Sequence, residues 1–274
     1  SMKKMYFGTR EKMQWVKCPA TNISRNRAKW QETGAYLNGG AFSAASAYSH
    51  MEYNIAWNLM ASEEAAKIMS YYEGVHGDGL IYFLEPFAKK SNVLPLHWSV
   101  PRLCIKDAPN LLPAGSARPT AVSVAGGPSG YPLVSAQFAV AGTDGTNPTL
   151  YIPVPPGENF YLSVRGVASG SAGIRVIPDT GTAVTLAPTV LGTPATTVQT
   201  NPGGVTLRLA GTGTFALNSM HATVGTSAPD YNVFRQGEGN SGVRFNGNPV
   251  RTGYSSALDL ESVTAEFVEV GAWL

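Results

Sequence analysis

The chain of 274 residues is longer than most single domains and can bury one large core or two smaller ones. Only 14% of its residues are charged, below the roughly 25% usual for soluble domains. The net charge of +2 is spread along the chain without a basic cluster, which argues against electrostatic capture of nucleic acid. No apolar run approaches the roughly 18 residues of a membrane-spanning helix. The basic start "SMKKMYFGTREKM" lacks the apolar stretch of a signal peptide.

The first predicted turn lies in "AYLNGGAFS", where Asn38-Gly39-Gly40 stands between apolar flanks. Glycine adopts positive φ without strain, so this pattern is typical of a hairpin. The next run, residues 49–59, alternates between apolar and polar residues and predicts a strand with one buried face. Its apolar positions are Met51, Tyr53, Ile55, Trp57 and Leu59.

A helix is predicted next, because the hydrophobic period changes after this strand. Ser62 is a good N-cap residue, and two glutamates follow it in the first turn, where the helix dipole favours negative charge. Gly74 supplies the C-terminal stop. The apolar stripe is formed by Ala65, Ile68, Met69 and Tyr72. Beyond a glycine-rich turn, "LIYFLEP" predicts a short buried strand that ends at Pro86, so we expect an α+β unit with one helix.

The composition changes near residue 106, where charged residues become rare and Gly, Ser, Thr, Pro and Val prevail. The segment 106–119, "KDAPNLLPAGSARP", contains three prolines and is the natural boundary. We therefore predict an α+β domain at 2–106 and a second domain at 107–274. Short alternating runs, with turn signals every roughly 8 to 12 residues, predict a jelly-roll β-sandwich for the second domain. The predicted fold class is mainly β.

Motifs for catalysis and metal binding are weak. The four histidines form no H-x-x-x-H or H-x-H pair, and Cys18 and Cys104 form no C-x-x-C motif. The two thiols fit buried small apolar residues, and a disulfide between them stays open. The turn that holds His76 and Asp78 resembles no phosphate loop. We expect no catalytic residue and no cofactor, with a structural calcium ion near Asp144 as the alternative, since jelly rolls sometimes hold one.

Two kinds of binding or catalytic site stay open in the second domain. A carboxylate pair for glycoside hydrolysis would require two distant acids to converge. The candidate acids are Asp144, Glu158, Asp179, Asp230 and Glu238. Residues 228–242, "APDYNVFRQGEGNSG", form a long polar loop, and loops at the end of a sandwich often bind a partner. Its candidate contacts to a glycan or a protein are Tyr231, Arg235, Gln236, Glu238 and Asn240.

Several segments, taken in order, resemble minor tail proteins of long-tailed phages that infect actinobacteria. They are "TGAYLNGGAFSAASAYSHMEYNIAWNL", the helix after it, "GDGLIYFLEPFAKKSNVLPLHWSVP" and the closing "FRQGEGNSGVRFNGNPVRTGYSSALDLESVTAEFVEVGAW". The first part is similar to the distal tail protein domain, a β unit with one helix that assembles into rings at the tail tip. The second part resembles carbohydrate-binding modules and galectin-like sandwiches.

The resemblance implies a structural, non-enzymatic component of the virion tail tip, assembled in the host cytoplasm. It implies a ring, hexameric in the family, between the tail tube and the host-recognition apparatus. The implied partners are copies of itself, the tube, tape measure and baseplate or tip proteins, and a glycan of the host surface. Ring assembly would also explain the low charge, because interface cores are depleted of charged residues. The alternative is a free carbohydrate-binding module or a glycan hydrolase.

Overall fold

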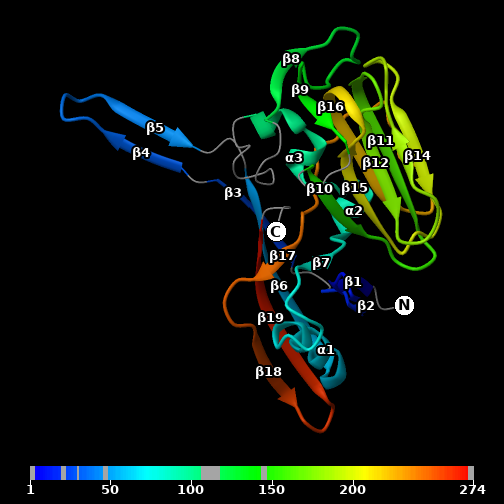
Figure 1. Cartoon of the computed structure of the whole chain (residues 1–274). Helices are drawn as coiled ribbons and strands as arrows, with labels where there is room; N and C mark the ends of the chain where they lie inside the picture. Colours follow the sequence, from blue (N-terminus) through cyan, green and yellow to red (C-terminus); the bar gives the residue numbers. More distant parts are fainter. Residues whose placement is uncertain are drawn as a thin grey trace.

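The structure is a computed structural model that describes residues 4–19, 23–29, 31–45, 49–105, 118–142 and 147–270. It is mainly β, with 51% of residues in strands and 10% in helices, which confirms the predicted class. Figure 1 shows three parts: a sandwich of two sheets, a long twisted sheet beside it, and a hairpin that projects away from both.

The long twisted sheet, called the first sheet below, contains segments from both ends of the chain. Its order is β2-β1-β7-β17-β19-β6-β3, and β18 pairs with the first half of β19 whereas β17 pairs with its end; all pairs are antiparallel. The strands are β1 Lys4–Thr9, β2 Lys12–Lys17, β3 Ile23–Ala28, β6 His50–Ala61, β7 Ile81–Phe83, β17 Val243–Phe245, β18 Val250–Ser255 and β19 Leu260–Glu269. Its core is aromatic, with Phe7 in edge contact with Trp57 and Phe267. Strands from the N-terminal and C-terminal segments therefore share one core.

Strand β6 follows the predicted alternation of buried and more exposed side chains as far as Trp57. Met51, Tyr53, Ile55 and Trp57 are buried as expected. Leu59 is instead 53% exposed and Met60 is buried, so the prediction for Leu59 is wrong. The register against β19 shifts between Glu261 and Val263, and Leu59 adopts a φ of 51°. This bulge inserts one extra residue and reverses the faces of the residues after it.

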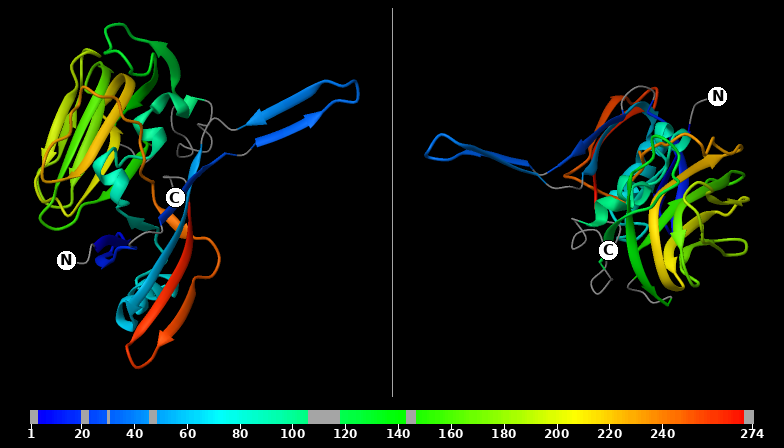
Figure 2. Two further views of the ribbon diagram at one scale, coloured as in Figure 1. Left: turned by 180° about the vertical axis from the view of Figure 1, so that it is seen from behind. Right: turned by 90° about the horizontal axis from the view of Figure 1, so that it is seen from above.

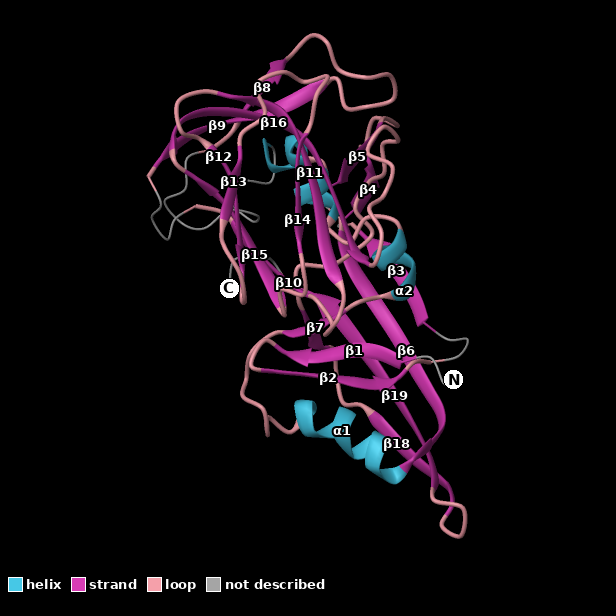
Figure 3. Cartoon of the chain, turned by 90° about the vertical axis from the view of Figure 1, so that its right-hand side faces the viewer, coloured by secondary structure: helices cyan, strands magenta, loops and turns pink. Residues whose placement is uncertain are grey.

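Helix α1, Ser62–Tyr72, covers the end of the first sheet beside the β1–β2 hairpin (Figure 3). Ser62 is its first residue rather than its N-cap, and its hydroxyl donates to Glu261 (2.8 Å). Tyr71 is buried in place of the predicted Tyr72, because its hydroxyl reaches the carbonyl of Lys12 (2.8 Å) and its ring packs on Phe7. Tyr72 is 38% exposed. The stripe therefore runs through Ala65, Ile68 and Tyr71. The helix stops before Gly74, whose φ is 74°, as predicted.

Two antiparallel sheets form the sandwich, which buries one apolar core between them. The five-stranded sheet has the order β14-β11-β16-β9-β8, and the four-stranded sheet has the order β10-β15-β12-β13. The strands are β8 Thr120–Ser123, β9 Val134–Ala141, β10 Thr149–Pro153, β11 Asn159–Ala168, β12 Gly173–Pro178, β13 Val184–Leu186, β14 Ala195–Gln199, β15 Gly204–Ala210 and β16 Thr212–Gly225. In β15 the core residue Leu207 alternates with half-buried polar ones, as the sequence predicts, whereas the outward face of β11, at Ser163 and Arg165, is buried as well.

The sandwich is inserted into the chain of the first sheet. The chain leaves that sheet after β7 and returns at β17, where Val243 pairs with Ile81. Between β7 and the sandwich lie α2 Pro86–Lys90, α3 Leu96–Ser99 and the 3-10 helix η1 Pro101–Leu103. The expected single helix is thus joined by two short ones. Glu85 caps α2 by accepting the N–H groups of Phe87 (3.1 Å) and Ala88 (2.8 Å), and proline suits the first helical position.

The sheet pairing departs from the predicted division at residue 106 in two places. Leu84, Leu94 and Trp98, expected in the first domain, belong to the sandwich core. Residues 243–269, expected in the second domain, complete the first sheet. The prediction followed a change in composition, whereas membership of a sheet is set by hydrogen bonds between strands far apart in sequence. Whether the two parts fold as separate domains stays a prediction.

The projecting hairpin, called the arm below, consists of β4 Gln31–Ala35 and β5 Ala41–Ala45. It confirms the hairpin predicted at Asn38-Gly39-Gly40, since Gly39 takes a φ of 87° in the turn. The views in Figure 2 show it standing clear of both sheets. Every side chain described in it is exposed, and Leu37 at the tip is completely so. Tyr36 and Phe42 contact each other, with ring centroids 5.4 Å apart.

Candidate functional site

The predicted binding loop, residues 228–242, runs between the sandwich and the first sheet as the connection from β16 to β17. Its start lies against the five-stranded sheet. The carbonyl of Tyr231 accepts hydrogen bonds from the Tyr131 hydroxyl (2.6 Å) and from Arg165 Nη2 (3.0 Å). The ring of Tyr231 is half-buried, and this burial raises the pKa of its hydroxyl to about 12. Tyr231 therefore holds the loop on the sandwich.

Arg165 is a buried charge in the middle of β11, and sequence reasoning missed it. It is 2% exposed and has no acidic partner among the described residues. Its guanidinium donates to the carbonyls of Gly192 (2.9 Å) and Tyr231 and lies 4.7 Å from the ring centroid of Tyr131. An arginine inside the apolar run "NFYLSVRGVASG" was the available signal, because a buried charge needs such partners.

Asn92 ties the middle of the loop to the sandwich. Its side chain is fully buried, and Nδ2 donates to the carbonyls of Met220 (3.1 Å) and Arg235 (2.8 Å). Its Oδ1 accepts the N–H of Ala222 (3.2 Å). The side chains of Arg235 and Gln236 stay exposed. These two are the predicted contacts whose side chains face solvent.

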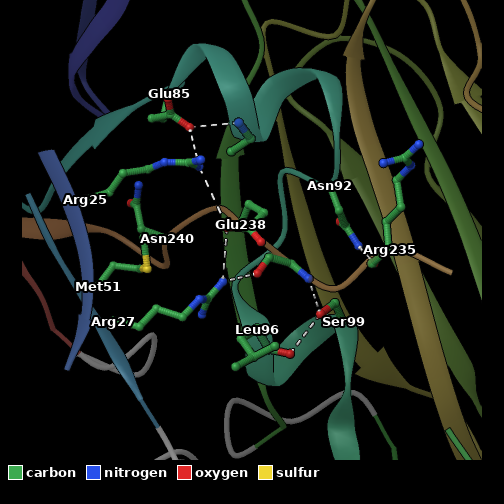
Figure 4. A network of polar contacts seen from close by, with 12 residues as sticks. Arg25, Arg27, Met51, Glu85, Asn92, Leu96, Ser99, Arg235, Glu238 and Asn240 are labelled. Atoms are coloured by element: carbon green, nitrogen blue, oxygen red, sulfur yellow. Dashed lines mark hydrogen bonds and ion pairs between the residues drawn. The ribbon is translucent and has the colours of Figure 1, made fainter. Parts of the chain in front are cut away.

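The end of the loop meets β3 in a charge cluster of Arg25, Arg27, Glu85 and Glu238 (Figure 4). Glu238 Oε2 lies 3.7 Å from Arg25 Nη1 and 3.7 Å from Arg27 Nη2. Arg25 Nη1 also lies 3.1 Å from Glu85 Oε2, and Arg27 donates to the carbonyl of Gly237. Two arginines thus face two glutamates, so the cluster is balanced and joins the first sheet to α2 and the loop.

Asn240 donates to the hydroxyl of Tyr53 in β6 (3.3 Å). Among the five predicted contact residues, Tyr231, Glu238 and Asn240 therefore make internal contacts. Burial raises the pKa of Tyr53, which keeps this hydroxyl protonated as a hydrogen-bonding group. A role of the five residues in binding a glycan or a partner stays a prediction.

A cleft of 580 Å³, called the junction cleft below, lies between the β1–β2 hairpin, α2 and the end of the sandwich. Tyr6 and Trp15 form its aromatic wall, with ring centroids 5.2 Å apart at an interplanar angle of 52°. Lys89 Nζ lies 2.5 Å from Glu158 Oε1 on the opposite wall. Residues 225–229 also line the cleft. Sequence reasoning missed this cleft, because its walls come from four segments that are far apart in the sequence.

The other candidate acids have separate surroundings. Asp179 accepts from the Tyr151 hydroxyl (3.3 Å), and Asp230 accepts the N–H of Asn232 (2.9 Å). Asp144, and with it the calcium alternative, lies outside the described residues. Within the described ranges, no group of three or more His, Cys, Asp or Glu side chains is placed to hold a metal ion.

Cys18 is half-buried and Cys104 is buried, and no disulfide joins them. No helix in the described part of the chain is long and apolar enough to cross a membrane. In comparisons with known proteins, no family model, no curated protein and no solved structure matches the chain.

Proposed function

We propose that the protein is a structural subunit of a phage tail tip, in which the first sheet and its arm assemble into a ring with other copies. The arm is the observation that carries this proposal. An isolated two-stranded hairpin is marginally stable in water, yet residues 31–44 form one that nothing else in the described chain covers. Its apolar side chains Tyr36 and Leu37 gain most if a neighbouring subunit buries them.

The first sheet also offers surfaces on which an arm can pair. Strands β2 and β3 end the sheet, so each leaves one row of N–H and C=O groups with no other described strand beside it. The arm itself carries a single charged residue, Glu32, which fits a segment that becomes buried on assembly. The order of segments that resembles phage minor tail proteins supports the same assignment.

The sandwich is proposed to be a jelly roll, similar to carbohydrate-binding modules and galectins, that stands outside the ring. The support is its strand order: β9-β16-β11-β14 in one sheet faces β10-β15-β12-β13 in the other. A jelly roll has eight strands in two such sheets. The proposed partners are other copies of the chain, the tube, tape measure and baseplate or tip proteins, and a glycan of the host surface.

Two measurements test the structural role. Gold-labelled antibody against the chain should bind at the distal end of tails in intact virions. A variant in which residues 32–44 are replaced by a short Gly-Ser turn should fold but form no ring with the tube protein, as seen by electron microscopy. The matched control is Leu258→Ser, at an exposed turn of the first sheet, which should assemble normally. Labelling on the capsid, or normal rings from the arm variant, would contradict the proposal.

A further inference from the structure

The aromatic wall of the junction cleft is a rigid platform that faces away from the core of the first sheet. Tyr6 and Trp15 are direct cross-strand partners in the β1–β2 hairpin, so their side chains lie on the same face. The neighbouring Phe7 points to the opposite face and is completely buried in the core. Tyr6 is nearly buried and supports Trp15, whose ring is 37% exposed. An indole of this kind can stack on the C–H face of a ligand ring.

The opposite wall is polar and positively charged. Lys89 and Lys90 come from the last turn of α2, while Lys4, two residues before Tyr6 in β1, adds a third ammonium group from the side of the aromatic wall. Of these three lysines, only Lys89 makes an ion pair with a described residue, Glu158. Three lysines therefore face one glutamate, which leaves the cleft with a net positive charge. Lys4 and Lys90 are exposed and have their ammonium groups available to an anion.

Glu158 adds a hydrogen-bond acceptor that the fold leaves without a donor. Its Oε1 accepts from Lys89, while Oε2 is buried and receives no hydrogen bond from the described residues. A buried carboxylate oxygen without a donor is costly. The last torsion of a glutamate side chain is soft, so we expect it to rotate and accept a hydrogen bond when a hydroxyl group occupies the cleft.

These features together match one ligand chemistry. A sugar ring has an apolar C–H face for Trp15 and hydroxyl groups at its edge for Lys89 and Glu158. An acidic substituent would meet Lys4 and Lys90. The volume of 580 Å³ falls within the roughly 300–1,000 Å³ usual for small-molecule sites. We propose that the junction cleft binds a sugar that carries a carboxylate or phosphate, stacked on Trp15 between the hairpin and the sandwich.

The site differs from the loop at 228–242, whose polar groups mostly hold the two parts of the molecule together. It is complete in one chain, so it does not require a ring. The inference rests on the proposed function only for the source of the sugar, which would be an acidic polymer of the host surface.

Binding is tested on the full chain by calorimetric titration. The probes are glucuronic acid and N-acetylmuramic acid as carboxylates, glucose 6-phosphate as a phosphate, and glucose as the neutral control. At least one acidic sugar should bind at least tenfold more tightly than glucose, and raising the salt concentration should weaken it. The preferred acid then separates carboxylated from phosphorylated polymers. Equal binding of glucose, or no binding of any acidic sugar, would overturn the proposal.

Variants locate the site. Trp15→Ala should lower the affinity at least tenfold, and Trp15→Phe, which keeps a ring, should lower it less. Lys90→Glu, at an exposed position, should abolish the preference for the acidic sugar. Tyr254→Ala removes an exposed aromatic ring of β18 outside the cleft and should leave binding unchanged. Unchanged affinity in Trp15→Ala, or tighter Trp15-dependent binding of a polyglutamate peptide than of every sugar, would refute the assignment. Trp15→Ala should still form rings, so loss of sugar binding can be distinguished from loss of the structural role.

Discussion

Replacing Glu85 by alanine is expected to lower the free energy of unfolding by about 2–4 kcal/mol. The side chain is fully buried and accepts three hydrogen bonds, from Phe87 N–H (3.1 Å), Ala88 N–H (2.8 Å) and Arg25 Nη1 (3.1 Å). Loss of the helix cap costs about 1 kcal/mol. Loss of the charged hydrogen bond to Arg25 costs about 1.5–3 kcal/mol in general. We expect a value near the lower end of this range, because the Arg25 side chain is 30% exposed and stays hydrated.

The measurement is urea unfolding followed by tryptophan fluorescence, with the m-value compared between variants. Glu85→Gln keeps one cap acceptor and loses the charge, so its cost should be about half as large. Glu63→Gln, in the exposed first turn of α1, is the matched control and should change stability by less than about 0.5 kcal/mol. If Glu85→Ala fell within that same range, the buried carboxylate would not stabilise α2 and the reasoning would be refuted.

Burial lowers the pKa of His97 to about 3, so stability should fall as the pH drops below the unfolded value near 6.5, by about 2 kcal/mol at pH 5. His97→Gln should flatten this pH dependence of the urea midpoint; an unchanged slope contradicts it. Ile68→Ala should cost about 2–5 kcal/mol and Tyr72→Ala under about 1, and equal losses would contradict the observed helix face. Gly239→Ala would place a Cβ 1.8 Å from a backbone carbonyl oxygen, so we expect it to lower the free energy of unfolding by about 1–3 kcal/mol in a thermal-unfolding experiment. A Cβ at Gly253 would have no atom within 4 Å, so Gly253→Ala is the control. Equal thermal midpoints for the two variants would contradict the close packing at Gly239.

Local patterns predicted what depends on local chemistry. Asn38-Gly39-Gly40 predicts a hairpin because glycine relieves a backbone strain that no distant residue alters. The alternation from Met51 to Trp57 predicts a buried strand face, since its period belongs to the backbone itself. The end of α1 at Gly74 was predicted for the same reason.

Features that depend on distant partners escaped prediction. The exposure of Leu59 follows from a bulge against β19, some two hundred residues away. The choice of Tyr71 over Tyr72 follows from a carbonyl in β2 that only Tyr71 reaches. Membership of the final strands in the first sheet escaped prediction for the same reason, since their partners stand at the other end of the chain.

The candidate sites show the same difference between local and long-range signals. A polar loop at 228–242 was visible in the sequence, but whether polar side chains face solvent or each other depends on what packs beside them. Arg25 and Arg27 of β3 reach Glu238 only in the folded chain. The junction cleft had no sequence signal, because Trp15 and Glu158 meet across an interface between parts of the fold.

The insertion of the sandwich sets the order in which the protein can fold during synthesis. Strand β6 lacks its partner β19 until residues 260–269 leave the ribosome, whereas all sandwich strands from β8 to β16 have by then emerged. If the sandwich folds as a separate domain, as predicted, it can do so while β6 still lacks β19 beside it. A premature stop after residue 242 would leave a complete sandwich attached to an unfinished sheet. Strands β17 to β19 thus complete the first sheet, and a truncated product keeps the β3–β6 pair that flanks the arm but lacks β19 beside β6.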